Sequence, residues 1–337
     1  MTQSRRSQIS LKDTCYYHLI SRCVRRSFLC GIDNYTKKSF EHRRQWMVNR
    51  IRFLSSIFAI DVASYAVMSN HYHLVVHVNE DESQSWSIEE VCERYENLYH
   101  LPSPVKQLLI SRENTETKNT TAICQLALEL VEKYRSRLSD ISWFMRNLNE
   151  YVARKANIED ECKGHFWESR FKSQALLDNK ALLACMAYVD LNPIRAKIAS
   201  SPSNSQFTSV FERIHDKSSE NDNKNNLPFK VKPLLGFVGA ENKNSIKGIA
   251  FSFRDYLQLV DETGRVMISK EKGRIDGIAP SLLHQLGIEG EDWLYLAKNF
   301  GRVYHQAVGS LELLVQFSEN TNKKWISGQR QQCKIFT

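Results

Sequence analysis

Two histidines one residue apart are the first candidates for chemistry in this sequence of 337 residues. His71 and His73 lie in a segment rich in β-branched residues, which is typical of a strand, so their side chains project from the same face. Two imidazoles placed in this way can hold one divalent metal ion and leave positions open for water and phosphate oxygens. His77 shares the face but lies about 13 Å farther along, at roughly 3.3 Å per residue, too far for the same ion. An H-x-H pattern alone is also common at structural positions, so a second group is needed.

That second group is a tyrosine in an apolar segment. The pattern predicts a helix over 180–191 and places Tyr188 and Asn192, four residues apart, on one helical face. A phenolate at Tyr188 could attack a phosphodiester while the amide oxygen of Asn192 joins the histidines as a metal ligand. The ion would polarise a phosphate oxygen and assist a nucleophile whose ordinary pKa is about 10. The combination indicates phosphoryl transfer.

Tyr151 is a competing nucleophile. It lies in a helix expected over 141–156, with Arg146 and Arg154 nearby. Its neighbour four residues on is Lys155, which supplies neither an amide nor an acid to a metal. The alternative role for this helix is to hold phosphates through its basic residues.

Three strands and four helices are expected to position these residues. The expected strands cover 16–24, 60–67 and 71–78, the last two forming a hairpin around 68–70. The expected helices cover 35–59, 122–134, 141–156 (with Asp140 as N-cap) and 180–191, and residues 164–175 form a loop or strand. Pro193 predicts that the last helix ends or kinks near Asn192.

At roughly 100–200 residues per domain, the chain length suggests two domains. We expect a first domain over 1–215, interrupted by an insertion at about 79–135 that is acidic at its start. A polar linker is expected over 216–228, followed by a mostly helical module over 229–337. The aromatic and basic helix expected over 292–304 could contact nucleic acid or could pack on a small core of its own.

Charge is unevenly distributed. The chain has 46 Lys and Arg against 38 Asp and Glu, a net charge of +8, while residues 1–60 have twelve against three. A basic surface facing a phosphate backbone is one explanation, and a solvated helix face is the other. No apolar run approaches the roughly 20 residues of a membrane span, and the N-terminus lacks the pattern of a secretory signal. The eight scattered cysteines include no C-x-x-C pair, so we expect reduced thiols in the cytoplasm.

Four ordered segments carry a resemblance to a known family. They are 17–22 (YHLISR), 68–76 (MSNHYHLVV), 164–173 (GHFWESRFKS) and 188–196 (YVDLNPIRA). Together they resemble the single-tyrosine HUH transposases (IS200-like), in particular the REP-associated tyrosine transposase branch. The resemblance covers about residues 10–215.

The resemblance implies an α+β fold, with a ferredoxin-like antiparallel sheet and helices, and a bound Mg²⁺ or Mn²⁺. It implies cleavage of single-stranded DNA beside an imperfect hairpin, giving a 5′-phosphotyrosine and a free 3′ hydroxyl. His71 and His73 would be metal ligands, Tyr188 the nucleophile and Asn192 a third ligand, although other branches have Gln at the last position. Ser69 stands where Pro is commoner, which affects the rigidity of the turn rather than the chemistry.

Several residues are expected to contact DNA. They are Arg25, Arg26, His165, Trp167, Arg170, Lys172 and Arg195. Core packing is the alternative for Trp167, and the N-terminal arginines could instead lie free in solution. The expected partner is single-stranded or hairpin DNA, without a membrane, for a monomer or homodimer in the cytoplasm at the nucleoid. A replication or conjugation nickase of the same chemistry is one alternative, and a hairpin-binding protein without catalysis is another.

Overall fold

One sheet organises the part of the chain that the structure describes. The computed structural model describes residues 7–24, 29–33, 37–113, 122–215, 229–239, 247–268, 279–324 and 326. The strands are β1 (Tyr16–Arg22), β2 (Ile60–Val67), β3 (His71–Val78), β4 (Lys172–Leu176) and β5 (Ala307–Val308), in the order β2-β3-β1-β4-β5. The three expected strands are confirmed, and the Met68 N–H closes the β2–β3 hairpin on the His71 carbonyl at 2.9 Å.

The expectation of an antiparallel sheet needs one correction. The β2–β3, β3–β1 and β1–β4 pairs are antiparallel, but β5 pairs with β4 in parallel. The sheet is therefore mixed. The parallel strand comes from the C-terminal part of the chain, which the sequence pattern did not connect with the sheet.

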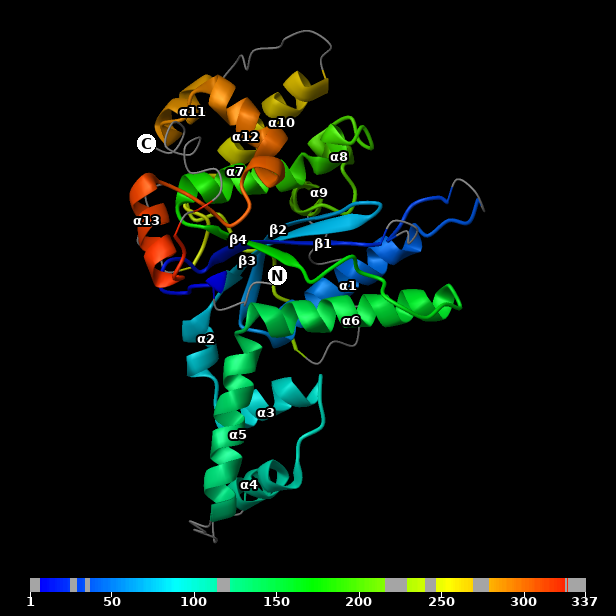
Figure 1. Cartoon of the computed structure of the whole chain (residues 1–337), viewed down its shortest axis with the longest axis vertical. Helices are drawn as coiled ribbons and strands as arrows, with labels where there is room; N and C mark the ends of the chain where they lie inside the picture. Colours follow the sequence, from blue (N-terminus) through cyan, green and yellow to red (C-terminus); the bar gives the residue numbers. More distant parts are fainter. Residues whose placement is uncertain are drawn as a thin grey trace.

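Helices cover both faces of this sheet (Figure 1). Alternate residues such as Leu19 and Leu74 pack in one core with α1 (His42–Ile57) and α6 (Ile141–Glu159). Val75, which points the other way, packs in a second core with α7 (Asn179–Asp190). Alternation along a strand thus sends β3 side chains into two separate cores.

The helix boundaries mostly follow the sequence prediction. Asp140 is the N-cap of α6, and its side chain accepts hydrogen bonds from the Ser142 and Trp143 N–H groups. Helix α1 begins later than expected, at His42. Helix α7 ends at Asp190, and a short helix, α8 (Asn192–Arg195), follows it directly, which is the break that Pro193 predicted.

The insertion is helical and projects away from the sheet (Figure 1). It consists of α2 (Glu80–Ser85), α3 (Ile88–Glu96), α4 (Ser103–Glu113) and α5 (Ala122–Leu138), of which only α5 was expected. Two buried arginines stabilise it: Arg94 donates to the Ser56 carbonyl at 2.7 Å and Arg135 to the Ser83 carbonyl at 2.6 Å.

Much of the C-terminal part packs in the core with α7, while Leu314 and Phe317 near its end lie in the core with α1 and α6. After η2 (Pro202–Asn204) and α9 (Ser209–Ile214) come α10 (Phe253–Ile268), α11 (Ala279–Leu286), α12 (Gly290–Val303) and α13 (Leu311–Asn320). Within the described ranges, α10 and α12 share one core with α7, so the small independent core considered for 292–304 is replaced by a shared one. The expected linker, 216–228, lies outside the described residues. None of the helices in the described ranges is long and apolar enough to cross a membrane.

A buried carboxylate joins α7 to the helices that follow. Asp190 is 0% exposed and accepts hydrogen bonds from the Tyr256 hydroxyl at 2.6 Å, the Val210 N–H at 3.1 Å and the Ser209 hydroxyl. A carboxylate in an apolar interior is stable only with such donors. The end of α7 is therefore fixed by contacts from α9 and α10.

We expect Tyr256→Phe to lower the free energy of unfolding by about 1.5–3 kcal/mol, because the Asp190 carboxylate loses a hydrogen-bond donor. Urea denaturation measures the change. Tyr151→Phe is the matched control, since its ring is 36% exposed, and it should change stability by less than about 0.5 kcal/mol. Equal effects of the two substitutions would contradict this role of Asp190.

Candidate active site

The two predicted histidines lie together at the start of β3. In the β1–β3 register, Arg22 is opposite His71 and Ile20 is opposite His73. The imidazole centroids of His71 and His73 are 4.9 Å apart, and their planes are nearly perpendicular, at 80°. His73 is only 3% exposed, whereas His71 is partly open to solvent. The pair therefore has one buried and one accessible imidazole.

Tyr188 of α7 lies against His73 of this pair. Its ring centroid is 5.5 Å from that of His73, with an interplanar angle of 87°. Burial raises the pKa of Tyr188, and the nearby Arg195 opposes that rise. The Arg195 guanidinium lies 4.0 Å from the Tyr188 ring centroid. The fold thus brings together a hydroxyl, two imidazoles and a cation from distant parts of the sequence.

These side chains fit a divalent cation. The His73 Nε2 atom is buried without a hydrogen-bond partner, which leaves a lone pair that a metal ion could use. The Asn192 amide nitrogen is also buried without a partner, but it is a donor, so only the side-chain oxygen of Asn192 could be a ligand. The His71 Nδ1 atom faces the Asn70 side-chain oxygen at 2.7 Å. Burial lowers the pKa of His71 to about 4, and burial lowers the pKa of His73 well below its usual range, so both rings are neutral at pH 7 and can offer a lone pair.

The ligands of such an ion would include no carboxylate. No group of three or more His, Cys, Asp or Glu side chains suited to a metal occurs in the described ranges. An ion held by the two imidazoles would therefore need its remaining ligands from water and from the predicted third ligand, Asn192. Imidazole ligands suit Mn²⁺ better than Mg²⁺, which prefers oxygen.

Helix α12 forms one wall of the site, which the sequence did not indicate. A Cβ atom at Gly301 would lie 2.6 Å from the Tyr188 hydroxyl oxygen, so glycine is needed for this close approach. The Phe300 ring centroid is 5.9 Å from that of Tyr188. Arg195 also donates a hydrogen bond to the Ala297 carbonyl at 2.9 Å. The C-terminal helices thus help to hold both Tyr188 and Arg195.

The competing tyrosine is placed elsewhere. Tyr151 lies on α6, the helix that packs on the opposite face of the sheet from α7. Its ring lies beneath the Arg50 guanidinium, at 4.6 Å from the ring centroid. It is therefore remote from the His71 and His73 face.

The predicted DNA contacts are dispersed. Lys172 is exposed and pairs with Ile20 in the β1–β4 register, which puts it on the face of the histidines. His165 and Arg170 are exposed in the segment before β4. Trp167 donates to the Asn149 carbonyl at 2.9 Å, and its ring lies 5.6 Å from that of Tyr72, on the α6 side.

These internal contacts favour the packing role that was the alternative for Trp167. Arg195 lies inside the site, against Tyr188. Arg25 and Arg26 lie outside the described residues.

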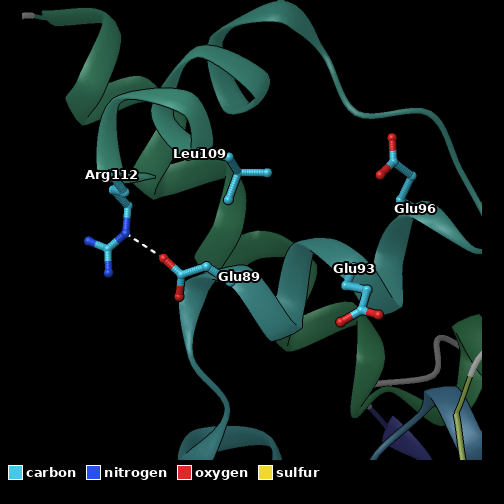
Figure 2. A pocket seen from close by; sticks show the side chains of 5 residues that line it. All are labelled: Glu89, Glu93, Glu96, Leu109 and Arg112. Atoms are coloured by element: carbon cyan, nitrogen blue, oxygen red, sulfur yellow. Dashed lines mark hydrogen bonds and ion pairs between the residues drawn. The ribbon is translucent and has the colours of Figure 1, made fainter. Parts of the chain in front are cut away.

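A separate cavity of about 370 Å³ lies in the insertion (Figure 2). Its lining residues are Glu89, Glu93, Glu96, Leu109 and Arg112. Arg112 already donates to Glu89 at 2.6 Å, so these two charges offset each other. Glu93 and Glu96 then make the lining acidic overall. Phosphate groups are disfavoured there, and the cavity is distinct from the Tyr188 site.

Comparison with known proteins gives little beyond this geometry. No protein-family model and no curated protein matches the sequence. A solved structure of a REP-associated tyrosine transposase bound to a REP hairpin aligns with 69% of this chain and 92% of its own, at 14% identity and a TM-score of 0.34. At these values the likeness assigns neither a family nor an activity.

His77 has a different role from the other two strand histidines. Its Nδ1 atom lies 3.2 Å from an Asp61 carboxylate oxygen. Burial lowers the pKa of His77, but hydrogen bonds to Asp61 and Cys15 outweigh it and raise the pKa to about 9. His77 is therefore held by an ion pair.

This ion pair predicts a pH-dependent stability. Since the pKa of His77 rises from 6.5 to about 9 on folding, its stabilising contribution is complete below pH 6.5 and is lost as the pH rises to about 9. We expect wild type to have a higher free energy of unfolding than His77→Gln at about pH 6. This advantage should be larger at about pH 6 than at about pH 9.5, by on the order of 2 kcal/mol. Urea denaturation at the two pH values measures this, and a difference independent of pH would contradict it.

Proposed function

We propose that this protein is a metal-dependent endonuclease and transposase that cleaves and rejoins single-stranded DNA near hairpins through a 5′-phosphotyrosine at Tyr188. The observation that carries the proposal is the position of the Tyr188 ring against His73, beside His71. A tyrosine that packs on a neutral imidazole with an unpartnered buried lone pair is the arrangement that a metal-assisted attack would use. The HUH-like motifs in the sequence support the same chemistry.

Tyr188 would act as the nucleophile. Its hydroxyl oxygen forms a bond to the phosphorus of a DNA phosphodiester as the bond from phosphorus to the 3′ oxygen breaks. The hydroxyl proton leaves Tyr188, and the departing 3′ oxygen takes up a proton. The products are a phosphotyrosine joined to the 5′ side and a free 3′ hydroxyl, which can later reverse the reaction.

Other residues would support this step. Mg²⁺ or Mn²⁺, held by His71, His73 and Asn192, would supply a Lewis acid for the phosphate. The Arg195 guanidinium, at 4.0 Å from the Tyr188 ring centroid, would stabilise negative charge that develops on the phenolate.

The charge around the site suits a phosphate backbone. Arg22 and Lys172 are exposed on the same face of the sheet as the histidines, and Arg170 is exposed just before β4. Cations at the rim of a phosphoryl-transfer site would fix the position of the strand without reading its sequence. The acidic cavity of the insertion would not take part.

The order of elements is compatible with the family that the motifs resemble. The chain passes through β1, α1, β2, β3, α6 and β4, leaving the helical insertion aside, which is the β-α-β-β-α-β order of ferredoxin-like units. A replication or conjugation nickase would use the same chemistry. A hairpin-binding protein without catalysis would need no unpartnered His73 Nε2 beside a tyrosine.

A covalent-adduct assay tests the proposal. A pool of single-stranded hairpin oligonucleotides with randomised flanks is labelled at the 3′ end and incubated with the protein and Mn²⁺. We expect a labelled protein band on a denaturing gel, because the 5′ phosphate of the downstream fragment stays on the tyrosine. Tyr188→Phe should abolish the band, whereas Tyr151→Phe should retain it.

The controls separate the alternatives. Labelling at the 5′ end should give a shortened strand and no protein band, and chelation of Mn²⁺ should remove both products. If the protein binds the hairpin oligonucleotides but forms no adduct, the alternative of a hairpin-binding protein without catalysis would be favoured. An adduct that persists in Tyr188→Phe and disappears in Tyr151→Phe would show that Tyr151, and not Tyr188, is the nucleophile.

A further inference from the structure

A third histidine, His18, lies behind the proposed metal ligands. It is on β1, two residues from Ile20, which is opposite His73, so it shares the face of the site. His18 is 0% exposed, and its Nε2 atom lies 2.9 Å from the Nδ1 atom of His73. The two rings differ in plane by only 18°, with centroids 5.1 Å apart, so they meet edge to edge. This geometry is that of a hydrogen bond between two imidazoles.

A glutamine on β4 fixes the direction of this hydrogen bond. The Gln174 side-chain nitrogen donates to the Tyr304 carbonyl at 2.7 Å. Its side-chain oxygen therefore faces His18 Nδ1, at 3.0 Å. A carbonyl oxygen only accepts hydrogen bonds, so His18 Nδ1 must have the proton.

The proton positions then follow along the hydrogen-bonded row of Gln174, His18 and His73. Complete burial favours a neutral imidazole, so His18 has its proton on Nδ1 and a lone pair on Nε2. His73 must therefore donate from Nδ1, which leaves its Nε2 atom without a proton. That Nε2 atom is the buried one without a hydrogen-bond partner.

We propose that His18 is a positioning residue that, together with Gln174, holds His73 in the tautomer and orientation needed to bind a divalent metal. The inference rests on the proposed function, because it concerns the metal site of that activity. Partners of metal-binding histidines typically act in this way, and their loss weakens metal affinity by about 10–100-fold. Because Gln174 is oriented by Tyr304, the segment just after α12 takes part in setting this site.

Mn²⁺ affinity tests the proposal without any measure of activity. The free ion is followed by electron paramagnetic resonance during titration of the full-length protein. We expect His18→Phe to weaken binding by about 10–100-fold, because phenylalanine cannot accept the His73 proton. His18→Gln should recover much of the affinity, since its side-chain oxygen can reach the position of Nε2 and accept that hydrogen bond.

A matched control removes another buried histidine from the same face. His77 lies outside this hydrogen-bonded row, so His77→Phe should leave the Mn²⁺ affinity within about twofold of wild type. Thermal unfolding of each variant without metal reports any loss of the folded structure. If wild type binds Mn²⁺ and His18→Phe binds it equally well, the role of His18 is wrong while the proposed function stands. If wild type binds no Mn²⁺, the metal site of the proposed function fails, and this inference fails with it.

A second measurement does not depend on whether a His18 variant folds. Long-range proton–nitrogen spectra of wild type with labelled histidine report which ring nitrogen has the proton, and His73→Gln assigns the His73 signals. We expect the proton on Nδ1 in His73. A proton on Nε2 of His73 would overturn the proposal, whatever the variants show.

Discussion

The pairing register of β1 with β3 is the constraint on which the site depends. It places Ile20 opposite His73, so that His18, Ile20 and the two histidines share one face. A shift by one residue would turn the His73 ring into the core with α1 and α6. The hydrophobic side chains of both strands prevent that shift, because they are buried against helices on each side. The apolar cores therefore set the positions of polar groups that would do chemistry.

The C-terminal part of the chain belongs to the site in physical terms. Gly301 and Ala297 of α12 contact Tyr188 and Arg195, and the Tyr304 carbonyl orients Gln174. Asp190 joins the end of α7 to Tyr256 of α10. A module that merely followed residues 1–215 in the sequence would not make such contacts. Changes in these helices are therefore expected to reach Tyr188 and His73 through direct contacts.

Local patterns predicted much of this arrangement. Strand alternation placed His71 and His73 on one face, and the apolar segment around Tyr188 predicted α7. Pro193 marked the break before α8, because a proline restricts the residue before it. These features depend on neighbours in the sequence, so a single chain was enough to find them.

Contacts between distant segments could not be predicted in the same way. His18 lay in an expected strand, but its relation to His73 depends on the β1–β3 register, which no local pattern reveals. The parallel strand β5 and the wall formed by α12 depend on the path of the whole C-terminal region. The sequence allows Trp167 either to stack on DNA or to pack in the core, and what decides is its contact with Tyr72, which is far away in the sequence.

The account's central claim is that Tyr188, beside His71 and His73, becomes covalently joined to DNA. Mass spectrometry of the trapped complex, after digestion with nuclease and protease, tests it most directly. We predict a phosphonucleotide on the Tyr188 side chain. A phosphonucleotide on Tyr151 or on any other residue would contradict the claim.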